Sequence, residues 1–355
     1  MANGKTIIFF ISDHGFGHAS RNIPIIRYIL EVNKDIGVII KTGKSQGKFI
    51  KSLIRDFNNR VSYFFEDMDI GLVLKENSLN IDVKKLTKEV ESYLESFEAR
   101  IAKENEFLKY NNVNLIVSDI VPWIFKCAKE LNIPSILISN FTWVEIYKEY
   151  LSEEIYGKYR ECYNLADKAL FYELYMKEMK EYIRGYKEIS LCSREFNLEK
   201  VDEIKKKFNR SIVYISVGRS VNLKDKIDVS NLNYDFIVTD GIELSGNNVY
   251  YLDKEISNTQ DYLMASKFVI TKAGWGTISE ALLAKKKIAV LSREKVAEDR
   301  NTIKKLISMR LAIEVKFDLE KILMDLEEFN PYYDKYDFRN DYKKIGNCLI
   351  SFMKG

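Results

Sequence analysis

The sequence predicts an α/β protein made of two domains, each built on a parallel sheet. Short apolar runs alternate with segments of helical periodicity along most of the 355 residues, as strands joined by crossover helices do. The strongly charged segment 199–210 interrupts this alternation and divides the chain in two. Gly-rich turns follow strands in both halves, and ligands of open parallel sheets bind at such turns.

The front half begins with an apolar strand, 7–11, that leads into a Gly-rich turn. Ile23, Ile26 and Leu30 then recur at helical spacing. The next expected elements are strands 37–41, 61–65, 113–118 and 133–139 and helices 47–54, 81–110 and 122–131, the last opened by its proline. The aromatic segment 143–186 is predicted to be helical throughout, and strand 188–192 to close the domain.

The back half repeats the alternation. Its expected strands are 211–217, 235–239, 248–252, 268–271, 287–291 and 311–315, with helices 277–285 and 301–309 and further helices at the end. We place the domains at 1–196 and 210–335, with a linker at 197–209 and a C-terminal helix at 336–355. No solenoid repeat is found, so we expect two Rossmann-like domains that face each other across a cleft.

The composition argues against several classes of partner and structural site. The chain has 55 Lys and Arg against 52 Asp and Glu, interspersed, which gives no support for a nucleic-acid partner. No secretory signal and no apolar run of about 18 residues is found, so we expect a cytoplasmic protein. The four cysteines form no C-x-x-C pair and only two histidines are present, so we expect neither a disulfide framework nor structural zinc.

Three familiar motifs are incomplete. Gly43-Lys44-Ser45 ends like a phosphate-binding P-loop, but Val38 stands where the first glycine is required. The turn 15–17 begins a dinucleotide fingerprint, but Ser20 replaces its third glycine and no acidic residue follows for a ribose. Asp67 and Asp69 have the spacing of a Mg²⁺ site, but we favour a reaction that needs no metal.

Both histidines lie in the turn after the first strand, which reads Asp13-His14-Gly15-Phe16-Gly17-His18. Glycines such as Gly17 let the backbone approach a ligand, and the following helix presents free N–H groups. Imidazole accepts a proton near neutral pH, so His18 is a candidate general base. The alternative is that both histidines only support the turn.

A second motif, Thr271-Lys272-Ala273-Gly274-Trp275-Gly276-Thr277-Ile278-Ser279-Glu280, joins a buried strand to an apolar helix. Its glycines and its helix N-terminus predict an anion site, and Glu280 is placed to bind a ribose diol. A further turn, Gly218-Arg219-Ser220, follows another strand of the same half, with Arg219 available for phosphate. The alternative is two ordinary strand–helix turns.

The patterns G-F-G-H-A-x-R and T-K-A-G-W-G-T-I-S-E resemble glycosyltransferases of the GT-B superfamily, in particular families 1 and 28. The first loop also resembles the glycosyltransferase-like part of plant arabinokinases. The resemblance implies the GT-B fold, with C-terminal helices that pack back on the N-terminal domain. It covers the domain order and most of the chain.

The resemblance also implies roles. His18 would deprotonate the acceptor hydroxyl and Asp119 would orient it, although by its position alone Asp119 could equally cap the helix that begins at Pro122. Retaining relatives carry Glu where this chain has Lys272, so an inverting mechanism is favoured. The residues implied for the nucleotide and diphosphate are Gly17, Gly218, Arg219, Ser220, Leu252, Lys272, Gly274, Trp275, Gly276, Thr277 and Glu280. Glu298 and Asp299 are implied for the donor sugar, and the Gln expected beside them is missing.

We therefore expect an inverting, metal-independent transferase that uses a nucleoside-diphosphate sugar, with UDP favoured, and an unknown hydroxyl acceptor. His14, Asn140 and Trp143 are candidates for the acceptor site. Some relatives use lipid-linked acceptors, so a peripheral membrane contact stays open. A nucleotide-sugar hydrolase or epimerase, and a non-catalytic nucleotide-sugar-binding protein, are the alternatives.

Overall fold

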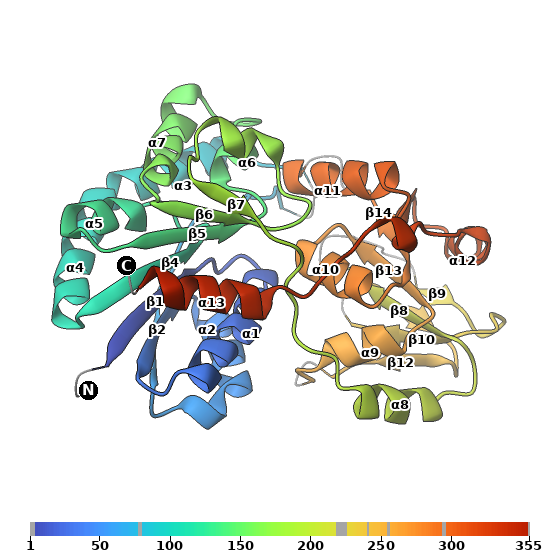
Figure 1. Cartoon of the computed structure of the whole chain (residues 1–355). Coiled ribbons are helices and arrows are strands. Elements are labelled where there is room, and N and C mark those ends of the chain that lie inside the picture. The colour runs from blue at the N-terminus through green and yellow to red at the C-terminus, as the bar shows by residue number, and fades with distance from the viewer. Residues whose placement is uncertain are drawn as a thin grey trace. The chain divides into compact units, whose positions relative to one another are not determined.

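The computed structural model describes residues 4–76, 80–217, 226–239, 241–253, 256–292 and 296–353. The chain divides into two compact units. Unit 1 comprises residues 1–73, 81–192 and 340–355, and unit 2 comprises residues 74–80 and 193–339. Each unit contains one large sheet (Figure 1).

The sheet of unit 1 has seven strands in the order β3-β2-β1-β4-β5-β6-β7, and every neighbouring pair is parallel. The strands are β1 (Lys5–Ile11), β2 (Ile36–Thr42), β3 (Val61–Phe65), β4 (Val113–Asp119), β5 (Ser135–Ser139), β6 (Lys168–Phe171) and β7 (Tyr186–Glu188). From Ile7 to Ile11 all five residues of β1 are completely buried, because helices cover both faces of a parallel sheet and its central strands are apolar on both.

Helices cover this sheet in two groups. The helices are α1 (Gly17–Val32), α2 (Lys44–Leu53), α3 (Val83–Glu95), α4 (Phe97–Tyr110), α5 (Ile124–Leu131), α6 (Trp143–Tyr147), α7 (Glu153–Asn164) and α13 (Tyr342–Phe352), with 3₁₀ turns at Arg55–Phe57 and Lys177–Glu181. Helices α1, α2 and α13 pack together, and α3, α4, α5 and α7 form the other group. No helix in the described part of the chain is long and apolar enough to cross a membrane.

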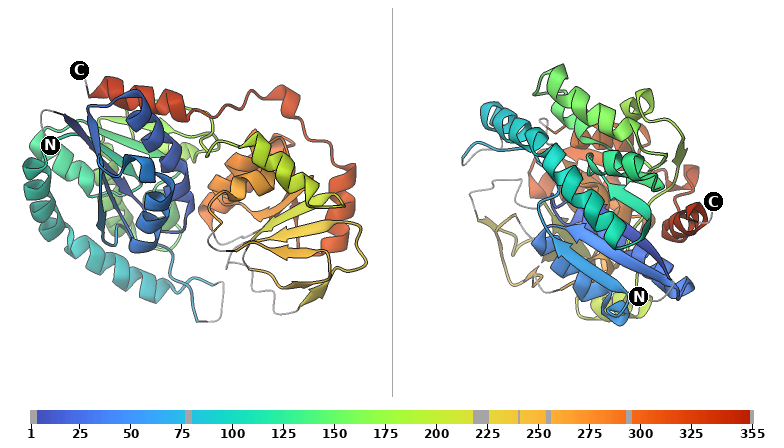
Figure 2. Two further views of the ribbon diagram at one scale, coloured as in Figure 1. Left: turned by 90° about the horizontal axis from the view of Figure 1, so that it is seen from below. Right: turned by 90° about the vertical axis from the view of Figure 1, so that its left-hand side faces the viewer.

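The C-terminal helix α13 packs on α1, as Figure 2 shows, although more than 300 residues separate them in the sequence. Tyr28 donates a hydrogen bond from its hydroxyl to Asn347 Oδ1 at 3.1 Å, and its ring meets that of Tyr342 edge to face with the centroids 6.0 Å apart. The expectation that the last helix returns to the N-terminal domain is confirmed.

Unit 2 has a six-stranded parallel sheet in the order β12-β10-β8-β13-β14-β15. Its strands are β8 (Ile212–Ser216), β10 (Asp235–Val238), β12 (Val249–Tyr251), β13 (Phe268–Lys272), β14 (Lys287–Leu291) and β15 (Ala312–Val315), and β9 (Ile227–Asp228) pairs with β11 (Leu244–Ser245). The helices are α8 (Leu198–Lys206), α9 (Thr259–Ala265), α10 (Trp275–Leu283), α11 (Ala297–Ser308) and α12 (Leu319–Glu328), with a 3₁₀ turn at Tyr333–Lys335.

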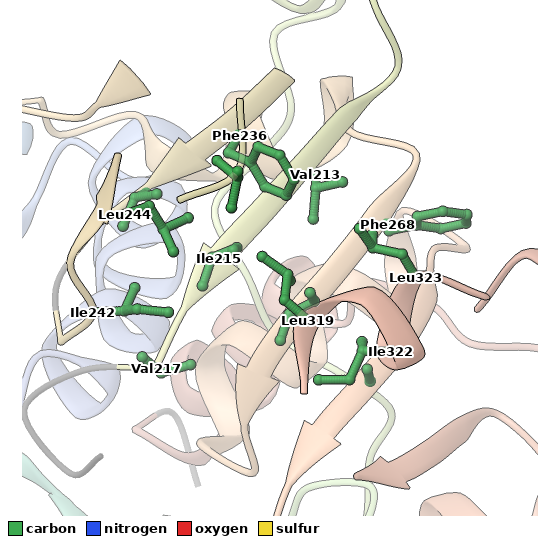
Figure 3. Packing of buried hydrophobic residues seen from close by; sticks show 14 of the residues in the cluster. Val213, Ile215, Val217, Phe236, Ile242, Leu244, Phe268, Leu319, Ile322 and Leu323 are labelled. Carbon is green, nitrogen blue, oxygen red and sulfur yellow. The ribbon is translucent and has the colours of Figure 1, made fainter. Parts of the chain in front are cut away.

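The core of unit 2 forms where α12 lies against one face of its sheet (Figure 3). Leu319, Ile322 and Leu323 follow the helical spacing that puts them on one side of α12. They pack in one cluster with strand residues such as Val213 and Phe268, both of which are completely buried. This apolar contact fixes α12 on the sheet.

Both sheets have the same strand order. In each, the first strand in the sequence lies in the interior, and the second and third extend to one side while the later strands extend to the other. This is the Rossmann order, and the expected α/β class is confirmed. The order reverses between β1 and β4 in unit 1 and between β8 and β13 in unit 2. Loops after these strands are the expected ligand sites.

Several expected elements differ from the structure, among them the predicted strand 188–192, because β7 comprises Tyr186–Glu188. The segment 143–186 is not helical throughout, because the short strand β6 lies within it and β7 begins at Tyr186. Strand β6 has only four residues, which are too few for sequence periodicity to distinguish a strand from a helix. The predicted helix 81–110 is two helices, and Ser96 at the junction bonds back through its hydroxyl to the carbonyl of Tyr93 at 2.6 Å. The expected linker 197–209 contains helix α8.

The contact between α13 and α1 depends on Gly346. A Cβ at this position would lie 2.5 Å from Cδ1 of Tyr28, so a larger side chain displaces the tyrosine ring or the helix. We expect Gly346→Val to lower the free energy of unfolding by about 1–3 kcal/mol, as overpacked cores do. Ser351→Val at an exposed position of the same helix is the control, and urea denaturation followed by tryptophan fluorescence compares the two. Equal stability of both variants would contradict the assigned contact.

Candidate active site

The candidate base lies in the first turn of α1, directly after the Gly-rich turn. Gly15 adopts a φ of +75°, which favours glycine, and α1 begins two residues later at Gly17. Spacings of three and four residues place Arg21 and Asn22 on the same face of α1 as His18. All three side chains are buried.

Asp119 faces them from the end of the neighbouring strand. It ends β4, and its register partner is Ile11, the last residue of β1. The next residue, Ile120, has a φ of +66°, which is strained for a β-branched side chain. Its carbonyl accepts a hydrogen bond from the hydroxyl of Tyr163 at 2.5 Å, which holds this turn in place.

Three side chains of α1 donate hydrogen bonds to the carboxylate of Asp119. His18 Nδ1 lies 2.8 Å from Oδ1, and Arg21 Nε and Asn22 Nδ2 donate to Oδ2 at 2.7 and 2.6 Å. Arg21 Nη2 also donates to Oδ1, so the guanidinium binds the carboxylate through two atoms. Asp119 does not cap α5, because that helix begins at Ile124 with Trp123 as its N-cap residue.

Arg21 connects this pair to the next strand of the sheet. Its Nη1 donates to Asn140 Oδ1 at 2.7 Å, and its guanidinium lies 5.0 Å from the ring centroid of Tyr172. Asn140, a candidate for the acceptor site, is 1% exposed and is thus part of this buried network. Arg21 is the last residue of the G-F-G-H-A-x-R motif, but sequence reasoning gave it no role, and it missed Asn22. Their helical spacing from His18 was the signal available.

The network sets the charges of its members. Burial alone would raise the pKa of Asp119, but the Arg21 guanidinium and His18 hold it well below its usual range, so the carboxylate is ionised and only accepts hydrogen bonds. Arg21 Nη2 also lies 2.9 Å from His18 Nδ1, but it has two other acceptors, Asp119 Oδ1 and Ser139 Oγ. The Nδ1 of His18 can therefore carry the proton and donate it to Asp119, which leaves Nε2 as the basic nitrogen. Burial lowers the pKa of His18 from 6.5, Asp119 opposes this shift, and Arg21 adds to it. The imidazole is neutral at neutral pH.

His14 and Trp143 contact a second buried carboxylate, that of Asp69. Its Oδ2 accepts from the indole nitrogen of Trp143 at 2.8 Å, and its Oδ1 lies 3.3 Å from His14 Nε2. Burial raises the pKa of Asp69 to about 7. Asp13, His14 and Asp69 place one potential metal-ligand atom each within 4.8 Å of one another, and Asp67 does not belong to this group.

The second motif forms the expected strand and helix in unit 2. Lys272 ends β13, and α10 begins at Trp275 with Gly274, which has no side chain, as its N-cap residue. A Cβ at position 274 would lie 3.5 Å from Cε of Lys272, so the lysine side chain runs past the start of the helix. Gly276 and Thr277 continue the first turn, whose N–H groups and dipole favour an anion.

Glu280 lies one turn further along α10 and is paired with a residue that sequence reasoning missed. Arg194 Nη2 donates to Glu280 Oε1 at 3.0 Å and to Thr259 Oγ1 at 3.1 Å. Both members of the ion pair are buried. Arg194 lies 86 residues before Glu280, and no local pattern links the two positions.

The structure describes some of the remaining predicted site residues but not all of them. The backbone N–H of Leu252 donates to the carbonyl of Val238 at 2.8 Å, next to the sheet. Glu298 is half-buried and Asp299 is buried in the first turn of α11, where a helix N-terminus favours acidic side chains. Trp275 is 3% exposed. Gly218, Arg219 and Ser220 lie outside the described residues.

Comparison of sequences identifies a distant relative. No protein-family model matches the chain. The L-arabinokinase of Arabidopsis thaliana is 25% identical to it over 314 residues, which cover 84% of this chain and 29% of that protein. The chain thus spans less than a third of the length of this curated relative.

Comparison of structures identifies the fold. The UGT2 of Phytolacca americana, in complex with UDP-2-fluoro-glucose and pterostilbene, aligns over 99% of this chain and 94% of its own, with a TM-score of 0.59 and 12% identity. The kitacinnamycin glycotransferase aligns over 99% and 100%, with a TM-score of 0.67 and 11% identity. The chain has the GT-B fold of these glycosyltransferases, as the sequence resemblance implies, and it is distantly similar in sequence to the arabinokinase.

The buried ion pair between Arg21 and Asp119 makes a testable contribution to stability. Removing one member leaves the other as a buried charge without its partner, so we expect Arg21→Met to cost about 3–5 kcal/mol of unfolding free energy. Arg27→Met removes a more exposed ion pair with Glu31 on the same helix, and we expect it to cost about 1 kcal/mol or less.

Urea denaturation of these variants, of Asp119→Asn and of the double variant Arg21→Met/Asp119→Asn completes the test. The double variant removes both charges, so its loss of stability should be smaller than the sum of the two single losses. Purely additive losses would show that the two side chains do not interact.

Proposed function

We propose that the protein is an inverting glycosyltransferase that moves a sugar from a nucleoside-diphosphate sugar, with UDP as the favoured nucleotide, to a hydroxyl group of an acceptor. The observation that carries the proposal is the pairing of His18 Nδ1 with Asp119 Oδ1 at 2.8 Å. This pair of side chains lies at the point where the strand order of the unit 1 sheet reverses. The GT-B fold and the UDP-sugar donor of a structural neighbour support it.

In the proposed reaction, Nε2 of His18 accepts the proton of the acceptor hydroxyl. The oxygen attacks the anomeric carbon of the donor, a carbon–oxygen bond forms, and the bond between that carbon and the diphosphate breaks. Asp119 fixes the tautomer and orientation of the imidazole and stabilises the positive charge that it gains. The attack comes from the side opposite the leaving group, so the configuration inverts.

The leaving diphosphate gains negative charge, and unit 2 offers groups to stabilise it. The first turn of α10 presents backbone N–H groups from Trp275, Gly276 and Thr277, and Lys272 brings a positive charge to the same helix end. Together these groups replace the charge that a metal ion would supply. We therefore expect transfer to continue in the presence of EDTA.

The first test compares two variants that act on different steps. His18→Ala removes the base, so we expect transfer to fall by about 10²–10⁴-fold while the dissociation constant for UDP stays nearly unchanged. Lys272→Ala should weaken the binding of UDP more than that of uridine, because it removes a charge opposite the diphosphate. Transfer rates and isothermal titration calorimetry measure both.

Several outcomes would contradict the proposal. Near-normal transfer by His18→Ala would exclude His18 as the base. Rapid stoichiometric release of UDP from UDP-sugars without any acceptor would identify a hydrolase. Saturable UDP binding with no turnover on a broad acceptor panel would identify a non-catalytic binding protein.

The pH dependence tests the environment of the base. Only neutral His18 accepts a proton, and its pKa is lowered from 6.5 mainly by burial. The neutral form therefore persists as the pH falls below 6.5, and we expect the acidic limb of kcat/KM to lie below that value. A pH–rate profile measures it. An acidic limb well above pH 6.5 would show that another group controls the reaction.

A further inference from the structure

The Gly-rich turn holds a second imidazole–carboxylate pair, formed by His14 and Asp69, that the proposed mechanism does not use. Asp69 is 3% exposed and belongs to an irregular segment after β3. Its Oδ1 accepts from the hydroxyl of Ser12 at 3.1 Å and its Oδ2 from the indole of Trp143 at 2.8 Å. A buried carboxylate with this many donors is held in one orientation.

The backbone on both sides of Asp69 is held by side chains as well. The carbonyls of Met68 and Ile70 accept from the hydroxyls of Tyr93 and Tyr147, and the carbonyl of Asp69 itself lies 3.2 Å from His14 Nε2. Three successive carbonyls of a segment without regular structure are therefore bound by side chains. This arrangement fixes the carboxylate beside the turn.

The same contacts define the tautomer of His14. A carbonyl oxygen only accepts hydrogen bonds, so the Nε2 that faces the carbonyl of Asp69 carries the proton. In the neutral form of the ring, Nδ1 then holds the lone pair. His18 has the opposite arrangement, with its proton on Nδ1 beside Asp119. The turn thus presents one basic nitrogen from each ring.

The ring of His14 is fixed although its side chain is 38% exposed. A Cβ at Gly71 would lie 2.4 Å from both Nδ1 and Cε1, so this glycine packs directly against the ring. On another side the ring meets Trp143 edge to face, with the centroids 5.3 Å apart. An exposed imidazole fixed by Asp69, Gly71 and Trp143 is pre-organised for a ligand.

A row of aromatic rings connects the two histidines. Trp143 contacts His14, Phe141 contacts Trp143 with centroids 5.9 Å apart, and His18 lies 5.9 Å from Phe141. The half-buried Asp13 adds a carboxylate to the turn. The groups offered here accept hydrogen bonds, so they suit a ligand that supplies donors, as hydroxyl groups do.

We infer that His14 positions the acceptor: its Nδ1 accepts a hydrogen bond from a second hydroxyl of the molecule whose reacting hydroxyl meets His18, so that the acceptor is a sugar or another polyol. Asp69 and Gly71 hold His14 in the required orientation. The inference rests on the proposed transferase function and adds the class of acceptor to it. A divalent cation bound by Asp13, His14 and Asp69 is the competing occupant, and the experiment separates the two.

The kinetic test uses His14→Phe, which keeps a ring but removes the nitrogen atoms. We expect the KM for free monosaccharides and inositols to rise about tenfold, the loss of one hydrogen bond, with a much smaller change in kcat. The KM for 4-methylumbelliferone, a flat acceptor with one hydroxyl, should stay unchanged. Gly71→Ala should reproduce the effect because it displaces the ring, and Lys44→Gln, at an exposed position nearby, should have none.

Because the chain has only two histidines, NMR tests the inference without catalysis. In ¹⁵N-histidine-labelled protein without a histidine tag, His14→Phe assigns the two rings. We expect an Nε2–H tautomer for His14 and an Nδ1–H tautomer for His18, and a shift of His14 Nδ1 on addition of a sugar or inositol. Gly71→Ala should abolish that shift.

The outcomes are distinguishable. An Nδ1–H tautomer of His14, or no response of its ring to any polyol in the panel, overturns the inference. A response of His14 to micromolar Zn²⁺ or Mn²⁺ but to no polyol overturns it in favour of a cation site. Polyol binding at His14 without turnover of any nucleotide sugar instead rejects the transferase function and retains the polyol site.

Discussion

The structure of unit 1 depends on a carboxylate that is almost completely buried and still ionised. Asp119 is 1% exposed, and burying such a charge is costly unless partners compensate for it. Arg21 supplies the opposite charge, and Asn22 and His18 supply further donors. Meeting this requirement fixes the start of α1 against the end of β4 and stabilises the strained turn at Ile120. Burial, with a smaller contribution from Arg21, lowers the pKa of His18 and keeps it neutral, as a general base must be.

The two units use one topology for opposite electrostatic purposes. In unit 1, the loop at the reversal of strand order leads to a buried imidazole with a basic nitrogen. In unit 2, the corresponding position carries the N-terminus of α10, whose N-cap residue is Gly274, and the side chain of Lys272, both of which favour an anion. A base and an anion site are the two elements that transfer from a nucleoside-diphosphate sugar requires. The shared strand order explains why both lie at the carboxyl ends of strands.

Local sequence patterns identified the candidate base and the candidate anion-binding residues. They did not identify the residues that form hydrogen bonds and ion pairs with the site residues. His18 and Lys272 follow apolar strands and glycines, so a reader of the sequence can find them. Arg21 binds Asp119 from 98 residues away, and Arg194 binds Glu280 from 86 residues away. Asp69 was considered only with Asp67, for a metal, whereas the structure places it beside His14 and Trp143. Pairings of this kind depend on which strands become neighbours in the sheet. The periodicity of a single sequence does not predict which strands these are.

By itself the sequence determined the α/β class, most strands and helices, the Gly-rich turns and the residues next to them, because strand and helix periods and glycine requirements are local properties. The tertiary structure alone decided that Asp119 serves α1 rather than the helix that follows it, that Asn140 is buried, and that His14 has a carboxylate partner. The reason is that buried polar groups are hydrogen-bonded, and tertiary packing determines which groups lie close enough to bond. Packing is a property of the whole sheet, whereas a motif records only its own few residues.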